Sequence, residues 1–236
     1  MIKAINVFLV ALAMPATAIA GSWSGHVDLG FNDTGGNSDT TSLNAALGAG
    51  YATGKWKHGL ELKALRSEDS DVVNAERYEA TGKSKYALSD ISYLFGQLDY
   101  EQDEFSGVYR RTSETLGYGR TLLDRKPHKL VGEISAGASQ VEFQDGDKQS
   151  GAIARLGLEY DWAISETAKF EQNLSVESGA INTYVESETS LKFAVTGSLY
   201  AKLGYVLKHN SEVPAGTSST DTVSSVSLSY EFGDQG

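Results

Sequence analysis

The 236-residue sequence predicts an all-β fold: a transmembrane, antiparallel up-and-down β-barrel of twelve strands with both termini in the periplasm. Three observations predict it. Apolar residues recur at every second position in twelve successive segments. Short and long connections alternate between these segments, as they do in outer-membrane barrels. The chain has no cysteine, so an exported protein of this length needs a large core or a closed hydrogen-bonded barrel to hold its fold.

Residues 1–20 predict a secretory signal peptide that is cleaved after its last residue. Lys3 precedes an apolar run over residues 4–14, and the Ala-Ile-Ala sequence of residues 18–20 supplies a small-residue cleavage site. The alternative, a membrane anchor, needs about 20 consecutive apolar residues, and this run is too short. Residues 21–236 are then a single barrel domain.

The strands follow one another along the mature chain. Their apolar faces are expected over Trp23–Phe31, Leu43–Tyr51, Trp56–Ala64, Tyr78–Tyr86, Leu94–Tyr100, Tyr109–Leu122, Leu130–Ala138, Ala152–Trp162, Phe170–Val176, Leu191–Val195, Leu199–Leu207 and Thr222–Phe232. The sixth segment is the least regular, because the charged residues Glu114 and Arg120 lie on its apolar face. No window has a convincing helical period, and no linker is visible.

The connections between the strands alternate in length. Short turns are expected at residues 53–55, 88–90, 123–128, 163–166 and 196–198. Longer loops are expected at residues 33–40, 67–76, 101–107, 144–150, 178–182 and 211–221. In an outer-membrane barrel the short turns are periplasmic and the long loops are outside, and an even strand number leaves both termini in the periplasm.

The apolar face of the strands is expected to contact lipid rather than a protein core. It is rich in Ala and Gly, which would fill the wide interior of a twelve-stranded barrel poorly, whereas lipid chains adapt to small side chains. Aromatic residues such as Trp23, Trp56 and Trp162 gather at strand ends, as in the girdles at membrane interfaces. A soluble barrel or sandwich with ordinary strand aromatics is the alternative.

The last strand is predicted to close the barrel by pairing with the Trp23 strand, so that neither edge is left unpaired. Tyr230 and Phe232 then face lipid. A carboxy-terminal strand that ends on an aromatic residue resembles the signal that the outer-membrane barrel assembly machinery reads, although four residues follow Phe232 here.

The inward face of the strands carries charges of both signs. The predicted lumen-lining residues are His26, Asp28, Lys57, Glu61, Arg77, Lys83, Lys85, Glu133, Arg155, Glu159, Asp161 and Glu171. Such a lining either surrounds water, as in a pore, or forms ion pairs across the lumen that plug it. The sequence leaves both possibilities open.

Negative charge is concentrated in the expected long loops. Cleavage of residues 1–20 removes only Lys3 among the charged residues, so the mature chain has 19 basic and 31 acidic residues and a net charge of −12. The loops carry thirteen of the acids and one base, Lys148, which predicts a raised cation concentration at the mouth of the barrel. The acids expected at the mouth are Glu68, Asp69, Asp71, Glu101, Asp103 and Glu104. No cluster of Lys and Arg favours nucleic-acid binding.

The pattern gives little support to catalysis. An outer-membrane hydrolase needs a nucleophile, a base and an orienting group at one place on the wall, and only His26 with Asp28 suggests a base and its orienter. A histidine held in a polar lumen network is the favoured interpretation. No His cluster and no calcium or phosphate loop is present, so we expect no catalytic residues, no metal site and no cofactor.

With the strands placed, the opening stretch GSWSGHVDLGFNDTGGNSDTTSLNAALGAGY resembles the first hairpin of the YdiY-like salt-induced outer-membrane proteins, a family of unknown function. The loop Thr34–Thr40 is similar to the family's TGN loop but has one extra Gly. The GKW of residues 54–56, the DYEQDEFSGVYRR of residues 99–111 and the LGYG of residues 116–119 are also similar to the family. The resemblance implies location and barrel type, and it carries no activity or catalytic residues.

The leading hypothesis is therefore a small cation-favouring channel or solute pore in the outer membrane of a Gram-negative cell, with a link to osmotic or salt stress that the family name implies. One alternative is a plugged structural barrel whose acidic loops bind divalent cations and lipopolysaccharide. Another is a hydrolase that uses His26 and Asp28. The expected partners are outer-membrane lipid, lipopolysaccharide and the barrel assembly machinery.

Overall fold

A computed structural model of the protein describes residues 21–34, 40–70 and 72–233. The strands of this part of the chain are β1 (Ser22–Thr34), β2 (Thr40–Thr53), β3 (Trp56–Asp69), β4 (Val72–Ser89), β5 (Ser92–Asp103), β6 (Val108–Arg125), β7 (His128–Phe143), β8 (Lys148–Ala163), β9 (Ala168–Gly179), β10 (Thr183–Thr196), β11 (Leu199–Asn210) and β12 (Thr220–Phe232). The expected all-β fold is confirmed. The predicted signal peptide lies outside the described residues. Within the described residues no helix is long and apolar enough to cross a bilayer.

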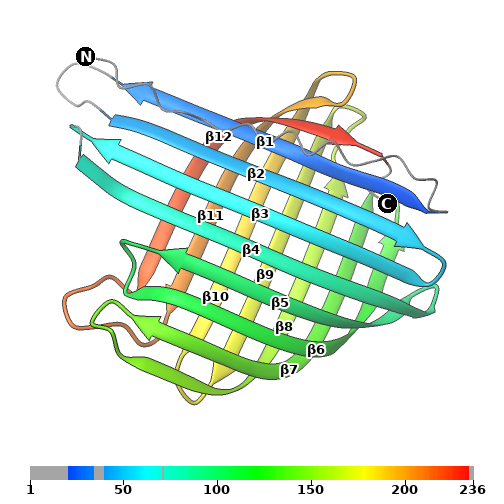
Figure 1. The fold of residues 1–236 in the computed structure, drawn as a ribbon. Coiled ribbons are helices and arrows are strands. Elements are labelled where there is room, and N and C mark those ends of the chain that lie inside the picture. The colour runs from blue at the N-terminus through cyan, green and yellow to red at the C-terminus, as the bar shows by residue number, and fades with distance from the viewer. Residues whose placement is uncertain (1–20, 35–39, 71, 234–236) are drawn as a thin grey trace.

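The strands form a closed barrel in which each strand is antiparallel to its neighbours in the sequence (Figure 1). The ring is closed by β1 and β12, which pair from Gly25 opposite Phe232 to Leu29 opposite Leu228. The last strand therefore pairs with the Trp23 strand as predicted. Because the ring is closed, no described strand presents a free edge that could pair with another chain.

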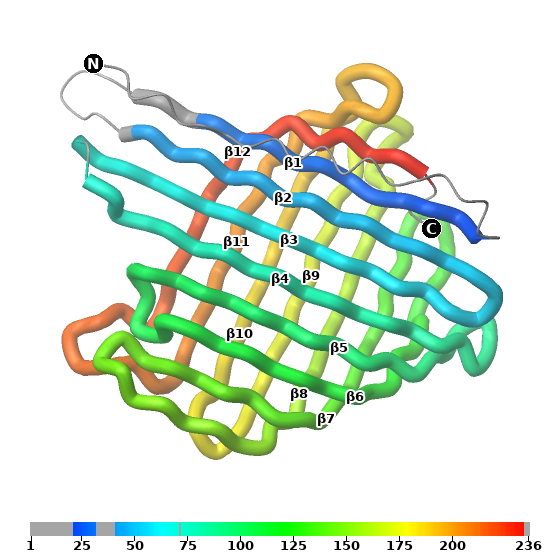
Figure 2. The backbone as a smooth tube through the Cα atoms, in the orientation of Figure 1, coloured from blue at the N-terminus to red at the C-terminus, as the bar shows by residue number. Residues whose placement is uncertain are grey.

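The two ends of the barrel differ in their connections, as the backbone tube of Figure 2 shows. At one end, called the short-turn end, the strands are joined by residues 54–55, 90–91, 126–127, 164–167 and 197–198. Gly54 and Gly197 have φ angles of +56° and +53°, which suits the tight two-residue turns of β-hairpins. At the other end, called the loop end, the connections that are described in full are residues 104–107, 144–147, 180–182 and 211–219; those between β1 and β2 and between β3 and β4 include residues outside the described part.

The predicted long loops are shorter in the structure, as two of them illustrate. The loop expected at residues 67–76 is almost entirely strand, because β3 continues to Asp69 and β4 begins at Val72. Similarly, β5 continues to Asp103, so the next loop begins at Glu104. The physical reason is that the ladder of backbone hydrogen bonds does not need an apolar face. Beyond the apolar band the outer face becomes polar, as in the cross-strand pair of Arg66 and Glu76, and the alternation of apolar and polar residues ends before the strand does.

Most apolar side chains of the barrel point outward, and most polar side chains point inward. Leu116 is 76% exposed and Val226 is 69% exposed, and both point outward from the wall. The uncertain sixth strand follows the same rule, since Glu114 and Leu116 are exposed while Ser113 and Thr115 are buried. This arrangement fits a lipid surround, in which exposed apolar side chains cost nothing.

Candidate functional site

A cavity of about 540 Å³ lies in the lumen and touches most of the strands around the barrel wall. Nine of the twelve predicted lumen residues line it: His26, Asp28, Glu61, Arg77, Lys83, Glu133, Arg155, Glu159 and Glu171. The other three, Lys57, Lys85 and Asp161, lie within a few residues of the short-turn end of their strands and do not line it. Alternating side-chain direction along each strand brings these residues, which are distant in sequence, to one surface.

The lining of the cavity is acidic overall. It includes the nine carboxylates of Asp28, Glu61, Glu79, Asp99, Glu133, Glu159, Glu171, Glu186 and Glu188. It includes the six basic side chains of Lys63, Arg77, Lys83, Arg155, Lys192 and Lys202. The nine carboxylates exceed these six basic side chains by three. Two further ammonium groups outside the lining pair with lining carboxylates, Lys208 with Glu79 and Glu186, and Lys85 with Glu133 and Glu159. With His26 neutral, the excess of negative charge is therefore one.

Many of these charges are paired, some between neighbouring strands and some between strands that are three apart in the ring. The Lys83 ammonium lies 2.5 Å from the Glu133 carboxylate, and the Arg155 guanidinium lies 2.6 Å from that of Asp99. The Lys192 ammonium lies 2.9 Å from Glu171. Such pairing is needed because a charge in a narrow lumen has lost much of its hydration. The carboxylates that remain in excess determine the sign of the field in the cavity.

His26 does not pair with Asp28, contrary to the arrangement considered for a hydrolase. Its Nε2 atom lies 3.2 Å from a Glu61 carboxylate oxygen, whereas Lys202 donates to Asp28 at 2.6 Å. The ring and the Glu61 carboxylate lie over Gly48, where an added Cβ would be only 2.3 Å from the ring and 2.6 Å from the carboxylate. The geometry is that of a histidine in a polar network, with no orienting role for Asp28.

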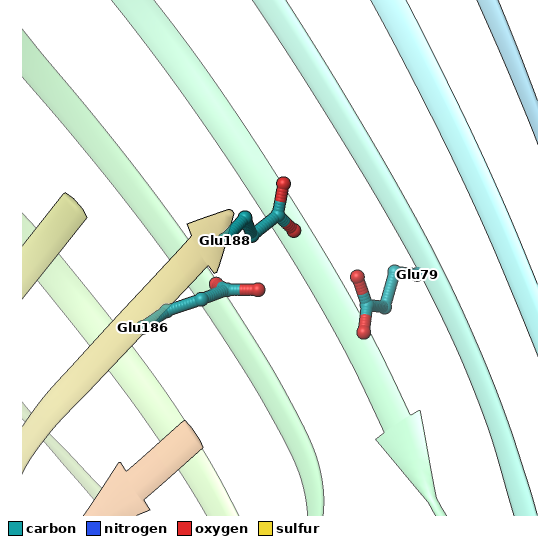
Figure 3. A group of neighbouring side chains, drawn as sticks. All are labelled: Glu79, Glu186 and Glu188. Atoms are coloured by element: carbon teal, nitrogen blue, oxygen red, sulfur yellow. The ribbon is translucent and has the colours of Figure 1, made fainter. Parts of the chain in front are cut away.

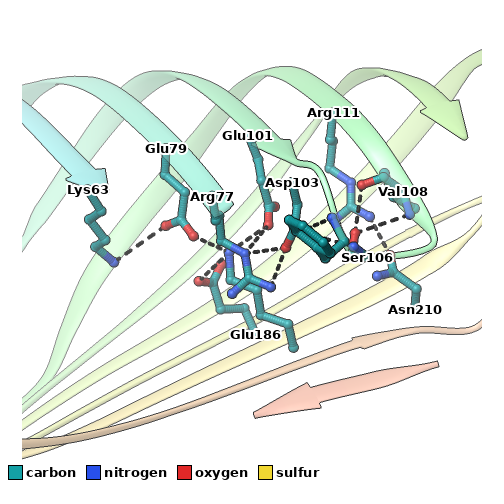
Figure 4. A network of polar contacts seen from close by, with 12 residues as sticks. Lys63, Arg77, Glu79, Glu101, Asp103, Ser106, Val108, Arg111, Glu186 and Asn210 are labelled. Atoms are coloured by element: carbon teal, nitrogen blue, oxygen red, sulfur yellow. Dashed lines mark hydrogen bonds and ion pairs between the residues drawn. The ribbon is translucent and has the colours of Figure 1, made fainter. Parts of the chain in front are cut away.

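Towards the loop end, opposite walls of the barrel are joined by a polar network (Figure 4). Lys208 of β11 donates to Glu79 of β4 and, at 2.8 Å, to Glu101 of β5. In the same layer Arg77 pairs with Asp103 at 2.5 Å. β11 and β5 are six strands apart in either direction around the ring, so the Lys208–Glu101 contact spans the lumen. The lumen is therefore crossed by ion pairs in this layer.

The predicted acidic mouth is wrong in part. Glu68 and Asp69 lie in β3, and Glu101 and Asp103 lie in β5; only Glu104 is a loop residue, and Asp71 lies outside the described residues. Glu68 is paired with Arg66 on the outer surface at 2.7 Å. Glu101 and Asp103 point inward to the network of Lys208 and Arg77. Basic residues that sequence reasoning assigned to the strands therefore neutralise several of the acids assigned to the loops.

Three carboxylates meet in the lumen, those of Glu79, Glu186 and Glu188 (Figure 3). One oxygen from each lies within 4.8 Å of the others, a spacing that could hold a metal ion. Two lysine ammonium groups form ion pairs with these carboxylates: Lys63 pairs with Glu188, and Lys208 lies 3.6 Å from Glu186. The cluster is thus largely neutralised by the chain itself.

Sequence reasoning missed the residues that close the loop end. Arg111, Tyr184 and Asn210 are all buried there. The Arg111 guanidinium lies 3.6 Å from the centroid of the Tyr184 ring and donates to the Asn210 amide oxygen. The inward parity of Arg111, opposite to that of Leu116, was a usable signal. The contact of Arg111 with Asn210 of β11 could not be predicted from the alternation of residues within β6.

Comparison with known proteins identifies relatives of the whole barrel. The family model described as "Protein of unknown function, DUF481" matches residues 27–232. The "Uncharacterized protein YdiY" of Escherichia coli strain K12 is 29% identical over 211 residues, which cover 89% of this chain and 83% of that protein. The resemblance inferred from the sequence motifs is thereby confirmed.

Solved structures with a similar course of the chain include the NanC porin, with 12% identity, a TM-score of 0.48 and coverage of 90% of this chain and 98% of the porin. The translocator domain of autotransporter NalP from Neisseria meningitidis has 14% identity, a TM-score of 0.48 and coverage of 92% and 90%. The KdgM porin has 11% identity, a TM-score of 0.41 and coverage of 89% and 99%. Likeness at this level does not extend to function.

Proposed function

The chain belongs to the DUF481 family of proteins of unknown function, and from its own lumen we propose that it is an outer-membrane channel that passes small cations. The observation that carries the proposal is the central cavity, whose nine lining carboxylates outnumber the six basic side chains in the lining together with the two, Lys85 and Lys208, that pair with it from outside. In a narrow lumen with low-dielectric walls, an excess of one sign raises the local concentration of the opposite ion. A role during salt stress, in which cation flow matters, accords with this selectivity.

The location is part of the same proposal. Outward-facing apolar side chains, inward-facing charges and twelve paired strands suit a Gram-negative outer membrane, where a closed barrel satisfies every backbone hydrogen bond. The short-turn end is then periplasmic and the loop end is extracellular. Export requires the cleavable signal proposed for residues 1–20, and insertion requires the barrel assembly machinery.

Some lumen side chains near the short-turn end are more exposed than those near the loop end. Near the short-turn end the side chains of Glu159 and Lys169 are 41% and 42% exposed, whereas the Lys208 side chain near the loop end is 4% exposed. A wetter periplasmic half suits a vestibule from which small hydrated ions reach the constriction.

A second candidate is a plugged structural barrel that bridges lipopolysaccharide through divalent cations at its outer rim. The observation that favours it is the set of ion pairs between opposite walls, above all those of Lys208. Pairs of this kind hold the barrel closed if they are permanent, and gate it if they exchange. Acids on the outer surface near the loop end, such as Glu68 and Glu142, would supply ligands for the bridging cations.

Reconstitution in a planar bilayer tests the proposal. We expect small single-channel currents whose reversal potential, in a gradient of potassium chloride, has the sign of cation selectivity. Selectivity should weaken as salt rises, because the Debye length falls from about 10 Å at 0.1 M to about 3 Å at 1 M. If the barrel conducts no current over a wide range of voltages and salt concentrations, the channel proposal is wrong and the plugged structural barrel takes its place.

Topology is tested separately in intact cells. The chain has no cysteine, so Ala215→Cys in the β11–β12 loop and Glu166→Cys in the β8–β9 turn each introduce a single thiol. A membrane-impermeant thiol reagent should label the first and not the second. Equal labelling of both from outside would refute the proposed orientation.

A further inference from the structure

The longest loop in the described part of the chain, residues 211–219 between β11 and β12, lies across the loop-end mouth. A Cβ added to Gly107, in the β5–β6 loop, would be 2.9 Å from Val213 Cβ and 3.2 Å from Pro214 Cδ. The two loops stand on opposite sides of the ring, six strands apart in either direction. Contact between them requires the 211–219 loop to span the opening. In Figure 2 the 211–219 loop (orange) lies on the same side of the barrel as the β5–β6 loop (green).

The base of this loop is held by amide hydrogen bonds. The Asn182 side-chain oxygen, in the β9–β10 connection, accepts from the Ser211 hydroxyl at 3.0 Å and from the Glu212 backbone N–H at 3.1 Å. The Asn182 side-chain nitrogen donates to Asn210 at 2.7 Å, and Arg111 of β6 donates to the same Asn210 oxygen. The loop is thus tied at its base to β6 and to the β9–β10 connection.

An apolar layer lies beneath the mouth on the β6–β7 side. Val108, Val141 and Phe143 form a buried cluster against which Ile181 packs. Val213 and Pro214 are half-buried on Gly107 and extend this apolar layer across the described part of the mouth. The remaining barrier below them is polar, and ion pairs such as Lys208–Glu101 exchange with water and cations once they are hydrated. Apolar contacts above these ion pairs would shield them from water and keep the constriction shut.

We propose that the 211–219 loop is a lid that closes the extracellular mouth by docking Val213 and Pro214 on Gly107, and that ions pass when it lifts. This inference rests on the proposed channel. The lid is poised to move because its docking contact is small, its remaining residues are largely exposed, and its tie to the wall consists of a few amide hydrogen bonds. Segments with few buried contacts open at low free-energy cost.

A disulfide tests the docked position. Gly107→Cys with Val213→Cys introduces two thiols into a chain that has none, and their Cβ atoms start about 1 Å closer than the usual 3.5–4.5 Å, a difference that two surface loops can absorb. In bilayers the oxidised variant should be closed, and a reductant should raise its open probability several-fold. The two single-cysteine variants should not respond to reductant.

A bulky substitution at Gly107 tests the open position of the lid. Gly107→Leu removes the space for Val213 and should hold the lid open, which raises open probability without a reductant. Ala215→Leu adds the same bulk to the exposed side of the same loop and is the matched control. As a readout independent of current, Ser225→Cys places a thiol at the cavity wall, and an impermeant reagent applied to intact cells should reach it faster when Gly107→Leu is present.

The outcomes separate the lid from the channel. If the oxidised and reduced disulfide variants conduct equally, and Gly107→Leu leaves Ser225→Cys labelling unchanged, the loop is not a lid and the channel stands. If the disulfide forms but neither the reduced variant nor Gly107→Leu conducts, the channel itself is wrong and the lid has nothing to gate.

Discussion

Lys208 on β11 donates a hydrogen bond of 2.8 Å to Glu101 on β5, and these two strands stand opposite each other in the barrel wall. The same ammonium reaches Glu79 and lies 3.6 Å from Glu186. One lysine therefore contacts three carboxylates from three strands. The width of the lumen in this layer is the length of one lysine and one glutamate, so the site both closes the barrel and ties its walls together.

Removal of this lysine should destabilise the barrel. Lys208→Met leaves Glu79 and Glu101 with a buried charge that has lost its nearest cation, and breaking a buried pair by removing one partner costs about 3–5 kcal/mol. Urea unfolding of the barrel in lipid vesicles, followed by its heat-dependent gel mobility, measures the loss in free energy of unfolding.

The matched control for that prediction is Lys148→Met. Lys148 is 70% exposed and pairs with Glu142 on the outer surface, where an ion pair contributes about 0–1 kcal/mol. The double variant Lys208→Met with Glu101→Gln should recover part of the lost stability, because one of the stranded charges is also gone. Equal unfolding midpoints for Lys208→Met and Lys148→Met would show that the lumen in this layer is hydrated.

Cation selectivity should depend on Glu61 more than on the acids of the rim. Among the described residues its ion-pair contact is with His26 alone, so its charge is not offset by a lysine or arginine. Glu61→Gln should move the reversal potential towards zero, most strongly at low salt, where screening is weakest. Glu104→Gln, at the exposed β5–β6 loop, is the control and should have little effect. If Glu104→Gln shifts the reversal potential more than Glu61→Gln does, the acids at the mouth, and not Glu61, determine the selectivity.

The fold could be predicted from the sequence because the signal is local. A residue's direction in a strand follows from its parity, so the outward faces of Trp23–Phe31 and Thr222–Phe232 were readable from alternation alone. Closure followed from the need to pair both edges. The lumen residues could be listed for the same reason, and nine of the twelve line one cavity.

The contacts across the lumen could not be predicted, because they depend on register and shear around the whole ring. Lys208 and Glu101 are 107 residues apart, and the sequence around either residue does not indicate which residue it will contact. The same limit explains the wrong assignment of Glu101 and Asp103 to a loop. Their strand continues past the apolar band, where the alternation that marks a strand disappears.

Glu114 should be a destabilising residue in the lipid-facing wall. It points outward from β6 between Leu98 of β5 and Ala138 of β7, and it is exposed. Charged side chains on the lipid face cost about 2–4 kcal/mol at the midplane for Lys and Arg, and less for Glu and near the interfaces. Glu114→Leu should therefore raise the free energy of unfolding in vesicles by about 1 kcal/mol. Ser113→Leu, which adds the same side chain to the buried neighbouring position, should lower it. A loss of stability in Glu114→Leu would mean that this carboxylate meets a partner outside the chain.

Phe232 is expected to act in assembly as well as in packing. Its ring lies over Gly25 of β1, where an added Cβ would be 2.6 Å from the ring, and its outer part is exposed where β12 ends. Phe232→Asp removes the terminal aromatic residue that we propose the assembly machinery reads, and it adds a charge near the interface, which costs only about 0–1 kcal/mol. Phe232→Tyr keeps the ring and is the control. We expect the Asp variant to accumulate in the periplasm and be degraded, while the purified variant still folds into vesicles that contain no assembly machinery. Failure to fold in those vesicles would assign the defect to the lost contact between β12 and β1, and normal levels in the outer membrane would show that the machinery does not read this residue.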